Sequence, residues 1–165
     1  MYAFQDWRAN TGRPHVQVLL VLFRTAQLAR GRGRRTRLLS TVLTVLYRAV
    51  SLFMYSIDIP VSTRIGKGLT IHHGMGLVVH SRCVIGENVT LRQSVTIGTS
   101  TTHGGAPVIG SRVNIGANSV ILGEIEVGDD TLVGAGSVVT RSASSGSVLA
   151  GNPARIVRHR SDVKG

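Results

Sequence analysis

An aliphatic residue returns every sixth position between residues 79 and 139 of this chain. The positions are Val79, Ile85, Leu91, Ile97, Ile109, Ile115, Ile121, Val127, Val133 and Val139, and His103 alone breaks the series. An α-helix repeats about every 3.6 residues and a half-buried strand about every 2 residues. A period of six is instead typical of a short strand followed by a turn, the pattern of a parallel β-helix. Because three such hexads close one triangular coil, we predict an all-β solenoid.

An earlier series with the same period is two residues out of phase with the later one. Its members are Ile59, Ile65, Ile71 and Leu77. The slip falls at residues 76–79, and we interpret it as a bulged or looped corner between coils. Residues 99–107 keep the count of six but lack the apolar residues of a buried strand, so we expect a loop that leaves the coil. Loops on a rigid scaffold commonly carry substrate contacts.

The repeats divide the chain into three predicted parts. Residues 1–57 form an N-terminal helical segment, residues 58–140 form the β-helix, and residues 141–165 form a C-terminal cap with a basic tail. Each coil of a solenoid buries its inward side chains only against neighbouring coils, so both open ends need caps. The first and third parts are therefore expected to cover the two ends.

Two apolar segments, 16–29 and 38–55, dominate the N-terminal part, and Arg24, Thr25 and Gln27 interrupt the first. Each is shorter than the uncharged stretch of about 20 residues that spans a bilayer. We predict an antiparallel helical hairpin docked on the first coil, preceded by a helix opening or surface anchor at residues 6–10. The alternative is peripheral attachment of residues 16–55 to an anionic membrane through apolar faces and an arginine-rich loop.

The net charge of +11 is concentrated towards the two ends of the chain and indicates polyanionic partners. Nucleic acid is not expected, because the chain has no recognised binding motif and only 4% aromatic residues. Cys83 is the single cysteine, which excludes an internal disulfide and favours a packed thiol in a reducing compartment. The first thirteen residues lack the charge order of a signal peptide, so we expect a cytoplasmic protein, with the inner face of the membrane as a further possibility.

The acid–base candidates near the repeats are Asp58, His72, His73, His80 and His103. His73 lies at an expected coil corner beside Gly74, which leaves its approach open. Asp58 precedes it by somewhat less than one coil, so the two side chains are placed to meet on one edge. A carboxylate on one ring nitrogen raises the basicity of the other. On spacing alone, a structural or merely exposed histidine stays open as the alternative, and the histidines show no usual metal-ligand spacing, so no metal is expected.

Several motifs together resemble the hexapeptide-repeat acyltransferases, and within them the serine acetyltransferase group. They are Asp58-Ile59, Ile65-Gly66-Lys67-Gly68, His73-Gly74, Gly76-Leu77-Val78-Val79, Ile85-Gly86, Val95-Thr96-Ile97-Gly98 and Gly151-Asn152-Pro153-Ala154-Arg155. The resemblance implies a left-handed β-helix and an acetyl-CoA-dependent O-acetyltransferase. It places the catalytic base on His73 and its partner carboxylate on Asp58.

The resemblance also implies where acetyl-CoA binds and how the chains assemble. Family members hold CoA in a groove between coils of adjacent subunits of a homotrimer. Carried over by motif, the CoA-binding residues are Ala117, Ala135, Thr140, Arg141, Arg155 and Arg158. The basic residues would neutralise the phosphates of CoA.

Departures from the serine enzymes bear on the acceptor. The aspartate that helps hold the serine ammonium is replaced by His72, and the arginine–histidine pair of the extended loop is replaced by residues 104–107, Gly-Gly-Ala-Pro. These features and the short N-terminus look more like the colanic acid branch, so a sugar hydroxyl of an exopolysaccharide or its precursor is favoured. We assign His72 and His103 to acceptor contacts. Serine O-acetylation and a non-catalytic trimeric binding module stay open as alternatives.

Overall fold

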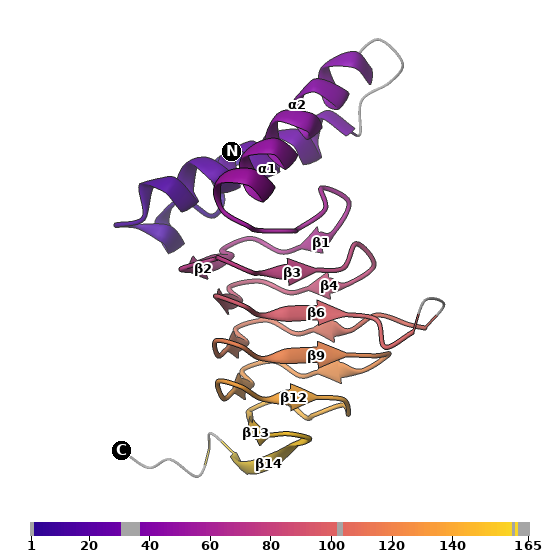
Figure 1. Ribbon diagram of the computed structural model, residues 1–165. Helices are drawn as coiled ribbons and strands as arrows, with labels where there is room; N and C mark the ends of the chain where they lie inside the picture. The colour runs from indigo at the N-terminus through magenta and orange to yellow at the C-terminus, as the bar shows by residue number, and fades with distance from the viewer. Residues whose placement is uncertain (1, 31–36, 102–103, 160, 162–165) are drawn as a thin grey trace.

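A computed structural model describes residues 2–30, 37–101, 104–159 and 161 of the chain. The chain rises as a stack of triangular coils with two helices across one end and the C-terminus at the other (Figure 1). It is a left-handed parallel β-helix, as predicted, and its three flat faces are three sheets.

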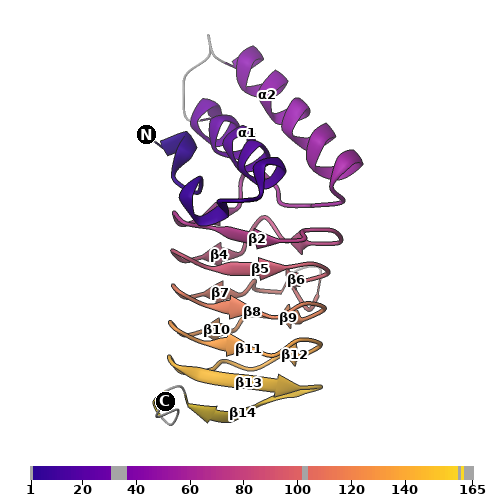
Figure 2. The same cartoon turned by 90° about the vertical axis from the view of Figure 1, so that its left-hand side faces the viewer.

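The strands of successive coils lie directly above one another (Figure 2). The first face contains β1 (Arg64–Ile65), β4 (Val84–Ile85), β7 (Val108–Ile109) and β10 (Glu126–Val127). The second contains β2 (Thr70–His72), β5 (Thr90–Arg92), β8 (Asn114–Ile115), β11 (Leu132–Val133), β13 (Ser147–Gly151) and β14 (Ala154–His159). The third contains β3 (Val78–Val79), β6 (Thr96–Gly98), β9 (Val120–Leu122) and β12 (Val138–Val139). The pairs are parallel except β13 with β14, where the chain turns back and covers the last coil.

The hexad aliphatics form the core. Ile71, Leu91, Ile115 and Ile121 are fully buried, and each stacks on its equivalent in the next coil. The turn between the first and second faces brings backbones very close, since a Cβ at Gly66 would lie 2.7 Å from the carbonyl oxygen of Gly86. The glycines after the marked aliphatics therefore permit the tight stacking of corners.

The strand register explains both irregularities in the sequence. Ile71 pairs with Leu91, twenty residues on, whereas Val79 pairs with Ile97, eighteen residues on. Two extra residues therefore lie between Ile71 and Val79. A looped corner is present, but the predicted position at residues 76–79 is wrong. His72 pairs with Arg92 and Gly76 lies against Ser94, so the insertion falls at residues 73–75. Ile97 pairs with Ile121, twenty-four residues on, because the chain leaves the coil after β6 and returns to it at β7 (Figure 1).

The N-terminal part is a helical hairpin across the first coil, as predicted. Two 3₁₀ turns, η1 (Tyr2–Phe4) and η2 (Arg8–Asn10), lead into α1 (Pro14–Arg30). The returning helix α2 (Arg37–Ala49) continues into a π-helical turn, η4 (Val50–Met54). Tyr47 of α2 packs against Phe23 of α1 and donates its hydroxyl to the Ile59 carbonyl at 2.9 Å, which fixes both helices to the start of the β-helix.

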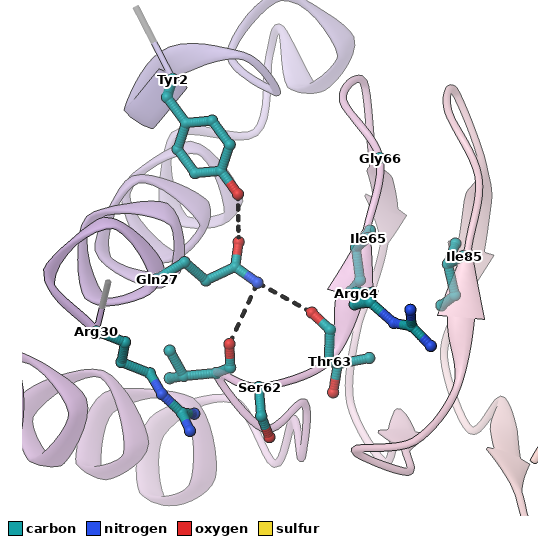
Figure 3. Close-up of a pocket in the computed structure, with 10 residues that line it drawn as sticks. Tyr2, Gln27, Arg30, Ser62, Thr63, Arg64, Ile65, Gly66 and Ile85 are labelled. Carbon is teal, nitrogen blue, oxygen red and sulfur yellow. Dashed lines mark hydrogen bonds between the residues drawn. The ribbon is translucent and has the colours of Figure 1, made fainter. Parts of the chain in front are cut away.

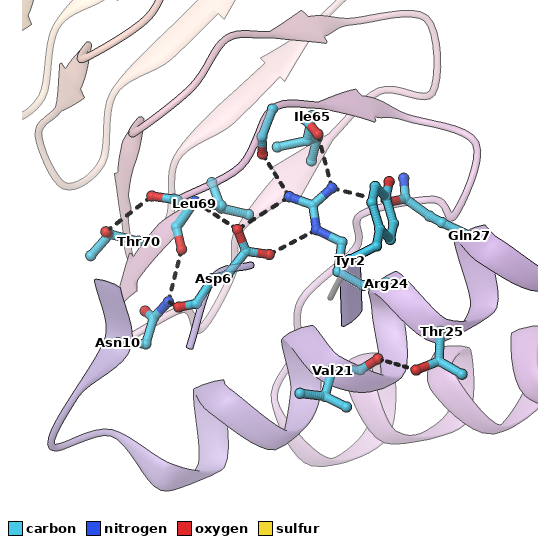
Figure 4. Close-up of polar contacts among 12 residues, drawn as sticks. Tyr2, Asp6, Asn10, Val21, Arg24, Thr25, Gln27, Ile65, Leu69 and Thr70 are labelled. Carbon is cyan, nitrogen blue, oxygen red and sulfur yellow. Dashed lines mark hydrogen bonds and ion pairs between the residues drawn. The ribbon is translucent and has the colours of Figure 1, made fainter. Parts of the chain in front are cut away.

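The first coil has no neighbouring strand on its outer edge. Polar side chains make the hydrogen bonds that such a strand would make (Figure 4). Arg24 is fully buried, pairs with Asp6 at 2.7 Å, and donates to the carbonyls of Ile65 and Gly66. Asp6 in turn accepts from the Leu69 amide. Arg24, which interrupts the apolar sequence of α1, is therefore the central residue of the cap on the first coil.

Asn10 completes this cap on strand β2. Its amide donates to the Leu69 carbonyl at 2.8 Å and accepts from the Ile71 amide at 3.1 Å, as a neighbouring strand would. Residues 8–10 do form a 3₁₀ turn ahead of α1, in keeping with the expected helix opening, but the alternative of a surface anchor does not fit Asp6 and Asn10, which are both buried. An edge backbone without water must find such partners.

Gln27 extends the same contacts along the rim between the hairpin and the coil. Its amide donates to the carbonyls of Val61 and Thr63, and its oxygen accepts from the Tyr2 hydroxyl (Figure 3). These residues line an open groove of about 520 Å³ that also includes Arg30.

We predict that Arg24→Ala destabilises the fold by about 3–5 kcal/mol, because it leaves a buried carboxylate and two carbonyls without their donor. Urea denaturation followed by circular dichroism measures the change. Arg82→Ala, at an exposed arginine of the β-helix, should stay within about 0.5 kcal/mol of wild type. If Arg24→Ala lowers the free energy of unfolding as little as the control does, the ion pair does not stabilise the cap.

Candidate active site

His73 lies on the looped corner of the first coil. Its backbone φ is +58°, an uncommon conformation for a residue with a Cβ, and its side chain is exposed. With Gly74 and Met75 it forms one wall of a cavity of about 300 Å³. The two-residue insertion therefore presents the imidazole at the mouth of a cavity instead of stacking it in the corner.

The opposite wall of this cavity comes from the helical hairpin. His15, Val16 and Leu19 of α1 contribute to it, together with Met54 and Tyr55 after α2. The rings of His15 and Tyr55 stack with centroids 5.9 Å apart. The sequence did not indicate this wall, because helical periodicity does not show where a helix docks.

Asp58 is held at the start of the β-helix by backbone hydrogen bonds. Its amide donates to the Leu77 carbonyl and its carbonyl accepts from the Val79 amide, so it lies beside strand β3. Its carboxylate pairs with Arg48 of α2 at 2.5 Å. Within the described ranges, no hydrogen bond joins Asp58 to His73, so the dyad stays a prediction. Arg48 was not foreseen as a site residue.

His72 lies half-buried on strand β2 and faces arginines. The Arg13 guanidinium lies 2.5 Å from its Nδ1 and 2.9 Å from its Nε2, and Arg92 is its register partner on β5. Burial, then the charges of Arg13, Arg92 and His73, lowers the pKa of His72 below its usual value. This shift favours the neutral imidazole, which can accept a hydrogen bond from Arg13.

The alanines predicted to contact CoA lie along the same edge of the triangular β-helix as His73, which is the edge between the second and third faces. We call each such edge a prism edge. Ile71 pairs with Leu91, and Ile115 pairs with Val133, which places Ala117 and Ala135 at the corners below His73. The Gly136 amide donates to the Ala117 carbonyl across these corners. The side chains of Ala117 and Ala135 are small, whereas Gln93 occupies the corner between Ala117 and His73.

The basic residues predicted to bind phosphate lie at the C-terminal end. Arg155 pairs with Ala150 on β13, directly below the edge that carries Ala135. Arg141 shares a cavity of about 270 Å³ with Arg155. Thr140 and Arg158 are exposed, but Thr140 and Arg141 follow β12 and so lie at a different prism edge from the alanines.

The remaining sequence candidates contribute less to this site. His103 lies outside the described residues. His80 accepts from the Arg82 amide within its own turn. The described ranges contain no group of three or more His, Cys, Asp or Glu side chains arranged for a metal ion. Cys83 is buried, as predicted, and burial raises the pKa of its thiol to about 11.

Comparison with known proteins identifies the family of the chain. Residues 106–141 match the family model described as bacterial transferase hexapeptide (six repeats). A colanic acid biosynthesis acetyltransferase, WcaB of Escherichia coli, is 35% identical over 97 residues, which cover 57% of this chain and 60% of the relative. Staphylococcus aureus serine acetyltransferase is 49% identical over 49 residues, which cover 30% of this chain and 23% of that protein.

The solved structure of soybean serine acetyltransferase complexed with serine superposes with a TM-score of 0.79 at 34% identity, over 94% of this chain and 68% of that chain. The chain belongs to the serine acetyltransferase family of hexapeptide-repeat proteins. It spans about 60% of the length of the curated WcaB relative. The family resemblance drawn from the motifs is confirmed, and so is the fold that it implied.

We predict that Arg13→Gln raises the pKa of His72, because the variant removes a neighbouring positive charge and opens the ring to water. The imidazole resonances of six histidines can be followed by NMR titration, with His72→Gln used for assignment. In wild type the midpoint of His72 should lie below 6.5, and in the variant it should move up. Arg82→Gln is the control, and an equal midpoint in both variants would contradict the role of Arg13.

Proposed function

We propose that the protein is an acetyl-CoA-dependent O-acetyltransferase in which His73 deprotonates a hydroxyl of the acceptor. The observation that carries this proposal is the placement of His73 on an inserted corner, at the mouth of a cavity and above an edge of small residues. Membership of the acetyltransferase family supports the same reaction.

The reaction transfers an acetyl group with no redox change. The imidazole of His73 takes the hydroxyl proton as the acceptor oxygen attacks the thioester carbonyl. Backbone amides stabilise the tetrahedral oxyanion, whose collapse breaks the carbon–sulfur bond. The CoA sulfur leaves and takes the proton from the imidazolium, so the products are the acetyl ester and free CoA.

Asp58 would orient the imidazole during this cycle. Its Oδ1 atom pairs with Arg48, which leaves Oδ2 to accept from a ring nitrogen of His73. That contact needs a change of side-chain rotamer at the corner, where the backbone already holds Asp58 beside the strand that follows His73. Arg48 then sets the position of the carboxylate.

Acetyl-CoA is assigned to the edge that descends from His73. Ala117 and Ala135 would let the pantetheine arm lie against the backbone, and Arg155 at the foot of this edge would meet the phosphates. Thr140, Arg141 and Arg158 are assigned to the same ligand. Since Thr140 and Arg141 lie at another edge of the chain, a homotrimer that brings two subunits together accounts for the full set.

A sugar hydroxyl is the favoured acceptor. Arg13 and Arg92 lie beside His72, the residue that precedes His73. Their positive charges would repel the ammonium group of a substrate such as serine. The name of the WcaB relative agrees with a glycan acceptor. L-Serine is the second candidate, because a solved relative binds serine in a closely similar fold. Loss of catalysis, leaving a trimeric binding module, is disfavoured by the presence of both Asp58 and His73.

The proposed location is the cytoplasm, where acetyl-CoA and a reduced Cys83 are both expected. Nucleic acid is not a proposed partner. Its binding would be recognised by a steep loss of affinity with salt and no sequence preference.

We predict that His73→Ala lowers the release of CoA from acetyl-CoA by about 100-fold or more, because it removes the base. Free thiol release measures turnover, and calorimetry checks that the variant still binds CoA. His80→Ala, which changes a histidine held in its own turn, is the matched control. Turnover of His73→Ala within a few-fold of wild type would rule out His73 as the base.

We predict turnover with sugars or nucleotide sugars and not with L-serine in the same assay. The arginines around His72 and the absence of an aspartate at that position are the physical reason. His73→Ala serves as the blank for each acceptor. Turnover with L-serine alone would instead assign the protein to serine acetylation.

A further inference from the structure

The outward side of α2 carries a continuous apolar stripe. Its members recur at three- and four-residue spacing and project from one side of the helix and its extension. They are Leu38, Val42, Val45, Leu46, Ala49 and Phe53, and each is exposed. Leu38 is 77% exposed and Phe53 is 88% exposed. We call these six residues the α2 stripe.

The inward side of the same helix is already packed. Tyr47 is buried, and Leu43 and Val50 pack against the hydrophobic core. The α2 stripe is therefore not needed to hold the hairpin on the β-helix. The sequence expectation that the second apolar segment is too short to span a bilayer is wrong, because residues 37–54 form a helix with the length and composition of a membrane-spanning one. Only 11% of that stretch is buried inside the fold. A soluble surface rarely leaves so many large apolar side chains side by side without a partner.

The charge of the hairpin indicates what covers the stripe. Residues 7–57 contain nine arginines and no aspartate or glutamate. Arg30, at the end of α1, and Arg37, at the start of α2, are both exposed. An apolar helical face with exposed arginines at one end is complementary to an anionic lipid surface.

We infer that the α2 stripe docks on an anionic membrane surface, with α2 lying in the plane of the headgroups. Leu38, Val42 and Val45 would enter the acyl boundary, and Arg30 and Arg37 would pair with acidic headgroups. The helix lies on the membrane and does not cross it, because its opposite face is packed on the protein.

Docking would also bring the candidate active site to the lipid surface. Phe53 belongs to the stripe, and the adjacent Met54 and Tyr55 line the cavity that holds His73. An acceptor carried on a lipid would then reach His73 without leaving the surface. This consequence rests on the proposed function, whereas the docking itself does not.

Vesicle flotation tests the docking directly. The full chain is mixed with vesicles of phosphatidylcholine alone or with about a third phosphatidylglycerol, at low and physiological salt. Wild type should float with the anionic vesicles and less with the neutral ones. Val42→Gln with Leu46→Gln should weaken partitioning about tenfold or more, because two apolar side chains no longer enter the lipid.

Two further variants sharpen the test. Arg30→Gln with Arg37→Gln should weaken partitioning about fivefold for each arginine and reduce its salt dependence. Val108→Gln, which changes an exposed valine of the β-helix, is the matched control and should float like wild type. His73→Ala should also float like wild type, so a failure of docking and a failure of the proposed reaction are separate results.

The docking is overturned if wild type does not float with anionic vesicles, or if the stripe variant floats as well as wild type. Light scattering provides the other decisive result. If the stripe variant halves the particle mass of wild type and neither binds vesicles, the stripe is an interface with a second copy of this chain.

Discussion

The open end of the first coil is the constraint on which the N-terminal half depends. Every later strand finds its hydrogen bonds on the coil above, but the first coil has none above it. Arg24, Asp6 and Asn10 supply those bonds from buried side chains. Buried ion pairs are stable only when their remaining donors and acceptors are satisfied, and here the coil's own carbonyls and amides satisfy them. The cap therefore fixes the hairpin in one orientation.

That orientation also builds the candidate site. The hairpin brings His15 and Tyr55 across from His73, and it brings Arg48 to Asp58. A change in the docking of α1 would move one wall of the cavity while the β-helix wall stayed in place. The end cap and the cavity beside His73 both depend on how the hairpin docks on the first coil. The stability of the fold and the position of this cavity wall are therefore coupled.

The sequence predicted the β-helix because every coil repeats the same environment, so the period of six appears directly in the aliphatic residues. It also revealed an inserted corner, since two extra residues shift the phase of everything that follows, but it placed the insertion a few residues too late because buried Leu77 looked like a member of the first series. The cap escaped prediction because Asp6 and Arg24 look like ordinary surface residues until the helix is docked. Arg48 and Arg13 escaped for the same reason. His73 was predicted from its glycine neighbour and the family motifs, and it does line a cavity, whereas the structure pairs Asp58 with Arg48.

The two faces of α2 explain why its sequence looks like a membrane helix in a chain that folds as a solenoid. Burying Tyr47, Leu43 and Val50 needs only one side of the helix, and a helix serving that purpose alone would be polar on the other side. Here the other side is apolar and flanked by arginine, so selection for packing does not account for it. An apolar face exposed to water lowers the solubility of the protein. An anionic membrane surface would bury that face and attract the arginines beside it. The hairpin then has two separable tasks, since its inward face closes the solenoid and its outward face determines where the active site works.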